Sequence, residues 1–229
     1  MKTALRKRRP LHEQTADDEL WGARPPKQAR SADVTWRIGR AAADLLASRP
    51  YHTVSVADIA AAAGISVGAV YTRFPTKEHV FVHLLGDLAE ELVTTMQREM
   101  NPHELARCTV DEVVRRYLLM VGKAFVRHRA LLAPATLIVR QTRDPQLQEL
   151  MRRFNAEVHG RLRALLLDRL GRNDARSIRR IDTAILWSSA AMREVILYGE
   201  PVSSLSRRQT TLIEELTRGV TLYLEAGNR

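Results

Sequence analysis

The sequence predicts an all-α protein. From residue 31 onward, apolar residues recur at spacings of three and four, and no stretch alternates apolar and polar residues as a half-buried strand does. Aromatic residues make up only 5% of the 229 residues, so the core must be built from Leu, Val, Ile and Ala. The abundance of Ala and Leu also favours helices. At about 150 residues per domain, this length allows one or two domains.

The composition argues against several classes of protein. A single cysteine, Cys108, can form no internal disulfide and cannot alone hold a structural zinc, so a cytoplasmic location is expected. No apolar stretch of about 18 residues is present, and no apolar segment follows the basic N-terminus, so we expect no membrane partner and no signal peptide. The motifs G-x-S-x-G, H-E-x-x-H and CxxC are absent, which predicts a protein that is not an enzyme and needs no cofactor.

The net charge of +10 is unevenly distributed. Residues 1–30 are expected to form a flexible basic arm, because no helical period persists there. The arm either contacts DNA or is a solvated tail, and a misassigned start codon would also explain it. Residues 33–99 carry 6 basic and 8 acidic side chains, and residues 100–229 carry 22 and 14. Charge therefore does not identify a nucleic-acid site in the first third of the chain.

Capping residues define four helices in the first part of the chain. The first begins near residue 31 and stops before Pro50, because a residue that precedes proline disfavours the α conformation. Ser55 caps the second helix, with Asp58 at the capping-box position, and Gly64 permits a left-handed turn at its end. A third, short helix starts after Ser66 and ends at Pro75. Thr76 caps a fourth helix that runs to about Glu99.

Five further helices are expected in the second half. Asp144-Pro145, Gly171-Arg172-Asn173 and Gly199-Glu200-Pro201 supply turn chemistry between them. The expected helices cover residues 109–128, 129–142, 145–170, 175–198 and 206–226.

The second and third helices form a predicted helix-turn-helix over residues 55–74. Such a motif needs two short helices joined by a tight turn, here Ala63-Gly64-Ile65-Ser66. Small Ala63 lets the helices approach each other, and Ile65 can fill the corner between them. The third helix would enter the major groove of DNA, where small residues allow the backbone to approach the bases. Its exposed face is expected to comprise Ser66, Val67, Gly68, Ala69, Thr72 and Arg73.

Residues 53–78, TVSVADIAAAAGISVGAVYTRFPTKE, resemble the DNA-binding signature of TetR/AcrR-type regulators. The resemblance covers about residues 32–92. It implies an all-α homodimer with two domains. An N-terminal three-helix DNA-binding domain is expected over residues 31–92, and a larger helical domain that binds a small ligand and dimerises over residues 93–229. It further implies a transcription regulator, in most members a repressor, that a ligand releases from a palindromic operator.

The resemblance also assigns roles to single residues. Tyr71 and Lys77 are expected to contact phosphates, with Thr53 and His79 as further contacts. Ser55, at the start of the motif, is also expected to be a DNA-binding residue. Val67 departs from the pattern, because Lys, Arg or Thr is frequent there. Base readout is therefore expected to depend on Ser66, Thr72, Arg73 and contacts with thymine methyl groups.

An effector pocket is expected between helices of the second half. Its candidate walls are large side chains at helical spacing, although such residues more often form the core. Arg140 and His159 could supply polarity toward an anionic or phenolic ligand, and surface pairing is the alternative for both. The pocket candidates are Tyr117, Met120, Phe125, Arg140, Phe154, Trp187 and Met192.

The helices at 175–198 and 206–226 carry more apolar residues than one face needs, which suits a four-helix seam with a second copy of the chain. Packing of the same faces within the chain is the alternative. The expected seam comprises Ile181, Ala184, Ile185, Ser188, Ala191, Val195, Leu212, Ile213, Leu216, Val220 and Leu224.

His79 and His83 lie one helical turn apart, but too few further ligands are available for a metal site, so an exposed polar face is expected there. The predicted function is a ligand-responsive transcription regulator whose partners are a double-stranded DNA operator, an unknown small molecule and a second copy of the chain. The alternatives are a nonspecific nucleoid-associated DNA-binding protein and a helical ligand-binding protein without operator function.

Overall fold

A computed structural model describes residues 29–142, 145–199 and 209–226, and within these ranges it is helical with no strand. The first helices are α1 (Ala29–Ser48), the short 3₁₀-helix η1 (Tyr51–Thr53), α2 (Val56–Ala63), α3 (Val67–Tyr71) and α4 (Lys77–Glu99). The second half contains α5 (Val110–Arg127), α6 (Arg129–Thr142), α7 (Pro145–Leu170), α8 (Ala175–Arg193), the π-helical segment η2 (Glu194–Tyr198) and α9 (Gln209–Glu225).

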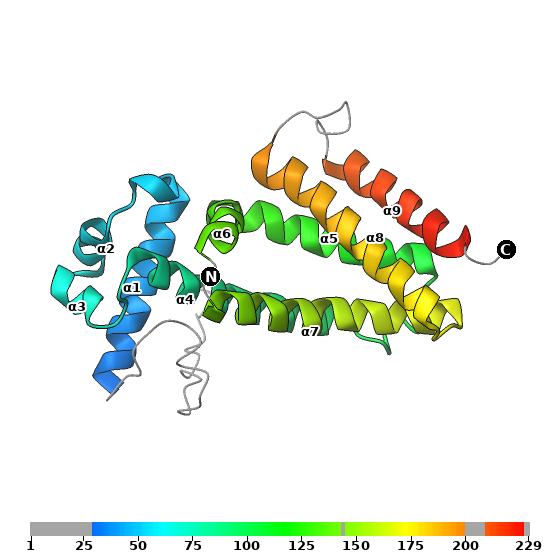
Figure 1. Cartoon of the computed structure of the whole chain (residues 1–229), viewed down its shortest axis with the longest axis horizontal. Coiled ribbons are helices and arrows are strands. Elements are labelled where there is room, and N and C mark those ends of the chain that lie inside the picture. The colour runs from blue at the N-terminus through cyan, green and yellow to red at the C-terminus, as the bar shows by residue number, and fades with distance from the viewer. Residues whose placement is uncertain (1–28, 143–144, 200–208, 227–229) are drawn as a thin grey trace, which may run out of the picture.

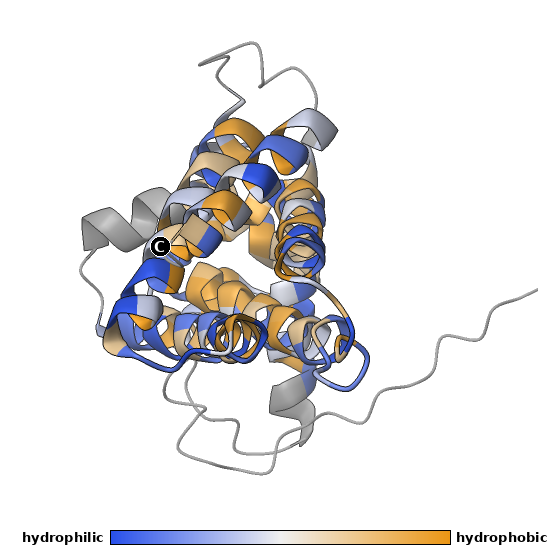
Figure 2. Ribbon diagram, turned by 90° about the vertical axis from the view of Figure 1, so that its right-hand side faces the viewer, coloured by the Kyte–Doolittle hydropathy of each residue, from blue (hydrophilic) through white to orange (hydrophobic). Residues whose placement is uncertain are grey.

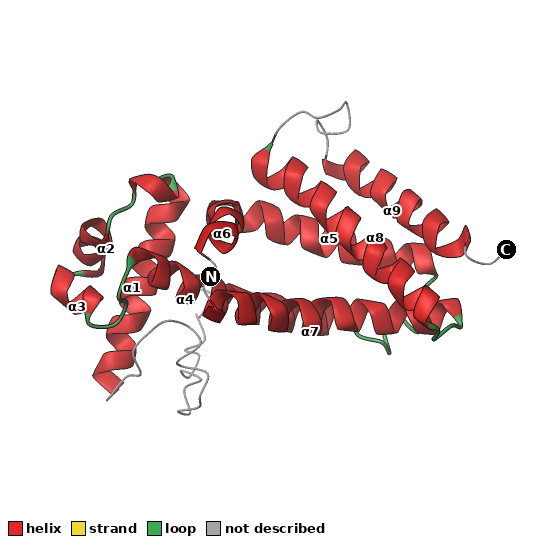
Figure 3. Ribbon diagram, in the orientation of Figure 1, coloured by secondary structure: helices red, strands yellow, loops and turns green. Residues whose placement is uncertain are grey.

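The molecule has two unequal parts (Figure 1). Helices α1, α2 and α3 gather at one end, α4 leads away from them, and α5, α7, α8 and α9 extend toward the other end, where the C-terminus lies. Figure 3 shows helices and the loops between them, with no strand among the described residues. Figure 2, which looks along the molecule from the C-terminal end, shows the apolar residues where the helices face one another.

The predicted all-α fold is confirmed, and helix ends agree with the expected ones to within a few residues. Helix α1 begins at Ala29, so the last two residues of the expected arm are helical, and residues 1–28 lie outside the described residues. The expected helix over 175–198 divides into α8 and the π-helical segment η2. For the last expected helix, 206–226, the structure describes only the part from Gln209 onward.

Two clusters of buried side chains form the cores. The N-terminal cluster is built mainly from α1, α2, α3 and α4, with Ile38, Ile59 and Phe74 completely buried. The C-terminal cluster is built from the end of α4 and from α5, α7, α8 and α9. Along α4, Ala89 packs against the N-terminal cluster and Val93 against the C-terminal cluster. One continuous helix therefore contributes to both cores.

The second half of the chain also completes the N-terminal cluster. Ala135 of α6 and Leu147 and Leu150 of α7 are buried within it. Helix α6 is in turn held at its start, because Arg129 donates a hydrogen bond of 2.9 Å from Nε to the carbonyl oxygen of Leu197 in η2. A displacement of α6 or α7 would therefore act directly on the core beneath the helix-turn-helix.

The expected seam residues on α8 and α9 belong mostly to the core of the chain, so this part of the prediction is wrong in detail. Packing within the chain accounts for them, because α9 lies against both α5 and α8. Eight of the eleven are buried, namely Ile181, Ala184, Ile185, Ser188, Leu212, Ile213, Val220 and Leu224. Val195 and Leu216 pack against the same C-terminal cluster.

Candidate nucleic-acid interface

Local interactions define both ends of α2. The Ser55 hydroxyl accepts a hydrogen bond of 3.1 Å from the Asp58 backbone N–H, and the Asp58 carboxylate accepts one of 2.8 Å from the Ser55 backbone N–H. This is the expected capping box, with Asp in place of Glu. At the other end, Gly64 adopts φ 66° and ψ 39°, and Ile65 N–H donates to Ala60 O at 3.0 Å, as in a Schellman motif.

The tight turn places α3 beside α2 with a defined inner side. Val70 and, just beyond the helix, Phe74 are completely buried in the N-terminal cluster. Arg37 of α1 also donates to the carbonyl oxygen of Ala63 at 3.3 Å, which satisfies an acceptor at the end of α2. Because α3 has only five residues, these anchors fix which of its positions face solvent.

The outer face of α3 carries two exposed apolar side chains. Val67 is 40% and Tyr71 47% exposed, and as residues one turn apart they share a face. Gly68 lies beside them, and a Cβ added there would meet only the Ser66 hydroxyl, at 4.0 Å. Ala69 and Arg73 are half-buried. The exposed face is therefore close to the predicted one, but it is smaller and more apolar.

Most hydroxyl groups predicted to contact DNA already donate within the protein. Thr53 donates to Pro50 O at 2.8 Å, Ser55 to the Asp58 carboxylate at 2.6 Å, and Thr72 to Gly68 O at 2.8 Å. Phosphate oxygens are acceptors, so these three hydroxyls cannot give them the same proton. Ser66 differs, because its oxygen accepts from Ala69 N–H at 3.2 Å and its own proton stays available.

Lys77 and His79 lie at the start of α4 and also have partners in the chain. Lys77 Nζ lies 4.1 Å from the centre of the Tyr51 ring and 3.3 Å from the Tyr51 carbonyl oxygen. His79 Nδ1 lies 3.0 Å from the Thr76 hydroxyl, which makes no cap to the α4 backbone. The Lys77 contacts hold the first turn of α4 against η1, a role that the sequence pattern did not indicate.

The hydroxyl of Tyr51 donates a hydrogen bond of 3.0 Å to the Glu78 carboxylate. Burial and the neighbouring Glu78 charge raise the pKa of Tyr51 above its usual value, so it stays a neutral donor. Burial acts to raise the pKa of Glu78, but hydrogen bonds from Thr76 and Tyr51 outweigh it and leave that pKa lowered. The pair thus ties η1 to α4 without a change of protonation near neutral pH.

The expected exposed face at His79 and His83 is wrong for His83. The side chain of His83 is only 12% exposed, and its ring lies 5.5 Å from that of Phe74. It also packs near Gly39 of α1, where an added Cβ would approach the His83 ring to 3.8 Å. A histidine on a long helix can belong to the core when a neighbouring helix covers it, and helical periodicity alone does not reveal that cover.

The predicted pocket residues do not surround one cavity in the described structure. Tyr117 and Met192 are buried in the C-terminal cluster, and burial raises the pKa of Tyr117 to about 12. Met120, Phe125 and Phe154 pack against that cluster. Trp187 lies at the surface, 39% exposed, with its ring edge-on to Tyr223. The side chain of Arg140 lies outside the described residues, so the pocket stays a prediction.

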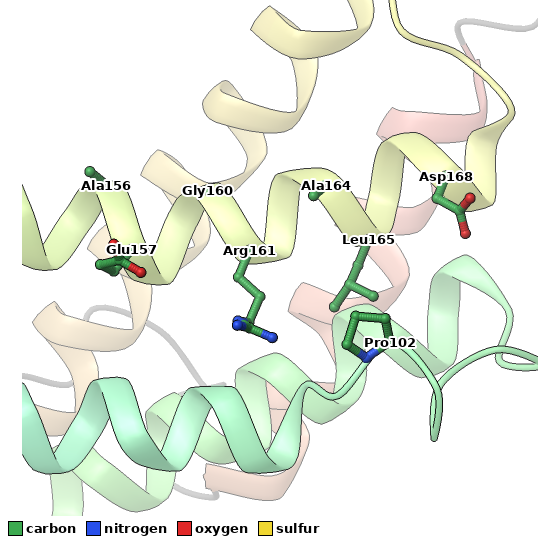
Figure 4. Close-up of a pocket in the computed structure, with 8 residues that line it drawn as sticks. All are labelled: Pro102, Ala156, Glu157, Gly160, Arg161, Ala164, Leu165 and Asp168. Carbon is green, nitrogen blue, oxygen red and sulfur yellow. The ribbon is translucent and has the colours of Figure 1, made fainter.

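A hollow of about 580 Å³ lies instead along the outer face of α7, next to Pro102 in the loop that follows α4 (Figure 4). Its floor is shallow because Ala156, Gly160 and Ala164 follow one another at four-residue spacing. Figure 4 shows Arg161 extending from α7 into the space between α7 and α4. No pattern in the sequence indicated this hollow.

A second apolar surface lies on α8 and α9, far from α3 (Figure 1). Leu186 is 71% exposed and Leu222 62% exposed, and Trp187 lies next to Leu186. We call these three residues the α8–α9 patch. The only sequence signal for them was the excess of apolar residues on these helices, which was assigned to the wrong positions.

Among the described residues, His, Cys, Asp and Glu do not gather in any group of three that could hold a metal ion. In the same ranges, every helix is too short or too polar to cross a membrane.

Sequence comparison links residues 38–84 to a known family. They match the profile described as bacterial regulatory proteins, tetR family, and the matched segment runs from the middle of α1 into α4. It therefore contains the capped α2, the turn and α3. No curated protein matches the chain significantly.

The fold is similar to that of several solved regulators. FadR of Thermus thermophilus, a TetR-family repressor solved with lauroyl-CoA, is 23% identical with a TM-score of 0.58, covering 83% of this chain and 93% of its own. FadR of Bacillus subtilis, solved with stearoyl-CoA, is 18% identical with a TM-score of 0.52. The match covers 80% of this chain and 98% of that protein. A TetR regulator from Rhodococcus sp. RHA1 is 18% identical with a TM-score of 0.51. The match covers 85% of this chain and 97% of that protein.

Proposed function

We propose that this chain, whose residues 38–84 match the tetR family profile, is a homodimeric transcription repressor that a small molecule releases from a palindromic operator. The observation that carries the proposal is the exposed, sparsely substituted face of α3, held by the buried Val70 and Phe74. Two such helices about 34–36 Å apart fit successive major grooves on one side of B-DNA.

The α8–α9 patch supports the proposed dimer. Large apolar side chains exposed on two adjacent helices are characteristic of an interface, and a second copy of the same patch would cover them in a four-helix arrangement. This assigns the seam to Leu186, Trp187 and Leu222 in place of the buried residues that the sequence suggested.

The N-terminal cluster supports the proposed response to a ligand. Leu147 and Leu150 of α7 are part of the core on which the helix-turn-helix rests. A ligand that binds better to the state with displaced α6 and α7 would shift the population of dimers away from the operator-binding spacing. The required difference in affinity corresponds to a coupling of about 1–3 kcal/mol.

The effector itself is an open part of the proposal. Two proteins of similar fold were solved with lauroyl-CoA and stearoyl-CoA, so long-chain acyl-CoA thioesters are the first compounds to test. The hollow along α7 and the predicted pocket around Tyr117 are the two places for such a ligand. Ligand-dependent protection from hydrogen exchange confined to α7 and the loop at Pro102 would favour the outer hollow, whereas protection that includes α5 and α8 would favour the interior pocket.

Selection of genomic DNA fragments by the purified full-length protein, followed by footprinting, tests the proposal. We expect a footprint with two-fold symmetry, whose loss on ligand addition identifies the effector. Gly68→Glu should abolish operator binding while the protein stays folded, because the open space at Gly68 accepts the side chain but its charge would face the groove. Val126→Glu, an exposed change on α5, is the matched control.

Leu222→Glu should convert the dimer to a monomer in sedimentation equilibrium, with Val126→Glu again as the control. An asymmetric footprint, or a monomer in the unmodified protein, would count against the dimeric repressor. Binding to all sequences with a steep salt dependence would favour the nucleoid-associated alternative. Ligand binding without any selected DNA would favour the helical ligand-binding protein.

A further inference from the structure

The outer face of α3 limits which chemical groups of DNA it can read. We infer that Val67 is a specificity-determining residue and that it reads the C5 methyl group of thymine in each operator half-site. The inference rests on the proposed function, because it requires α3 to lie in the major groove.

Val67 is the first residue of α3 and is 40% exposed, although its side chain is a branched hydrocarbon. The two residues that follow, Gly68 and Ala69, extend the surface by at most one carbon. Neither Gly68 nor Ala69 projects beyond the two methyl groups of Val67, so neither would keep this end of α3 from the floor of the groove. The buried Val70 and Phe74 prevent α3 from rotating to present another side.

Few polar side chains near Val67 could contact the same base. Thr72 uses its proton on Gly68 O, at 2.8 Å. Ser66 keeps a proton to donate but lies at the cap, where its oxygen is held by Ala69 N–H at 3.2 Å. Tyr71 is one turn further along and presents a hydroxyl at the end of a long ring. Val67 is therefore the aliphatic group on this face.

Of the groups at base edges in the major groove, the thymine C5 methyl is the apolar one. Valine placed against it buries two hydrocarbon surfaces, whereas valine placed against the amino group of cytosine would remove a donor from water without a partner. The side chain thus favours thymine both by attraction and by exclusion. Burial of one methyl group corresponds to about fourfold in affinity, and two half-sites give about fifteenfold.

Binding of the full-length protein to a selected operator and to its uracil-substituted forms tests the inference. Each thymine is replaced by deoxyuridine at symmetric positions of both half-sites, which removes only the methyl group. We expect one symmetric pair of positions at which uracil weakens binding about fifteenfold. In Val67→Ala this sensitivity should disappear at the same pair, while preference at the remaining positions is kept. Val126→Ala, an exposed valine on α5, should behave as the unmodified protein.

Selective binding that tolerates uracil everywhere would overturn the inference and leave the proposed function intact. An unchanged uracil effect in Val67→Ala would likewise assign the methyl contact to another residue. Absence of any preferred DNA sequence would overturn the proposed function together with this inference. Because Val67 is exposed and outside both cores, circular dichroism of Val67→Ala should match that of the unmodified protein.

Discussion

The helix-turn-helix and the α8–α9 hairpin are both pairs of adjacent helices, but different interactions hold them. Neighbouring residues in the sequence define α2 and α3, through the capping box at Ser55 and the left-handed turn at Gly64. Helices α8 and α9 are placed by side chains distant in sequence, because α9 packs against α5 as well as α8. Local rules therefore describe the first pair well and assign the faces of the second pair poorly.

Of the changes considered, removal of a core side chain that α7 contributes should destabilise the region around α2 and α3 most. Leu147→Ala in α7 is expected to lower the free energy of unfolding by about 2–5 kcal/mol, because it leaves a cavity in the N-terminal cluster. Hydrogen exchange should become faster in α1 and α4. The matched variant Leu162→Ala, in the same helix but in the C-terminal cluster, should have its effect in α5 and α8. Identical exchange patterns would contradict the division into two clusters.

The turn at Gly64 should contribute less, through backbone strain alone. An added Cβ meets no atom within 4 Å at either Gly64 or Gly160, but only Gly64 has a positive φ. We expect Gly64→Ala to destabilise the protein by about 1–2 kcal/mol. Gly160→Ala, in the middle of α7, should instead stabilise it by up to about 1 kcal/mol. Urea unfolding measures the stability of both variants. Equal effects of the two substitutions would contradict the role of the left-handed turn at Gly64.

The capping boxes allow a closer comparison of the two regions. Ser55 caps α2 with Asp58, and Thr109 caps α5 with Glu112 in the same geometry. Ser55→Ala and Thr109→Ala should each cost about 1 kcal/mol of stability in thermal unfolding. Only Ser55→Ala should also weaken operator binding, because α2 positions α3. A similar loss of DNA affinity in Thr109→Ala would show that the cap acts on binding through global stability.

Mild acid should have the smallest effect on stability. It should act first on the C-terminal half of the chain, which contains His128 and His159. Burial and the nearby Arg163 charge lower the pKa of His159, against the opposing charge of Asp182. The unfolded chain therefore binds more protons below about pH 6.5, and stability falls as the pH decreases through that range. His159→Gln should reduce the fall measured between pH 7.5 and 5.5. His128, whose pKa burial also lowers, should account for part of the remainder.

The capping box of α2 should respond only to stronger acid. Hydrogen bonds from the Ser55 hydroxyl and backbone lower the pKa of Asp58 below its usual value of 3.8. The stability that this carboxylate contributes is present above that value and is lost as the pH falls below it. An acid transition near pH 6 that is confined to α2 and α3 would contradict the comparison.

The sequence by itself determined the helical fold, the approximate helix ends, the capped α2 and the turn before α3. Each of these depends on residues within one or two turns of one another, such as Ser55 with Asp58 or the left-handed Gly64. The exposed positions of α3 followed for the same reason, because the burial of Val70 sets the register of a five-residue helix.

Only the tertiary structure decided which faces of the long helices are covered. It placed His83 against Phe74, removed Ile181 and Leu212 from the expected seam, and left Leu186 and Leu222 exposed. It also placed Leu147 in the core beneath the helix-turn-helix. Periodicity reports that a face is apolar. Whether another part of the chain covers that face depends on contacts between distant segments.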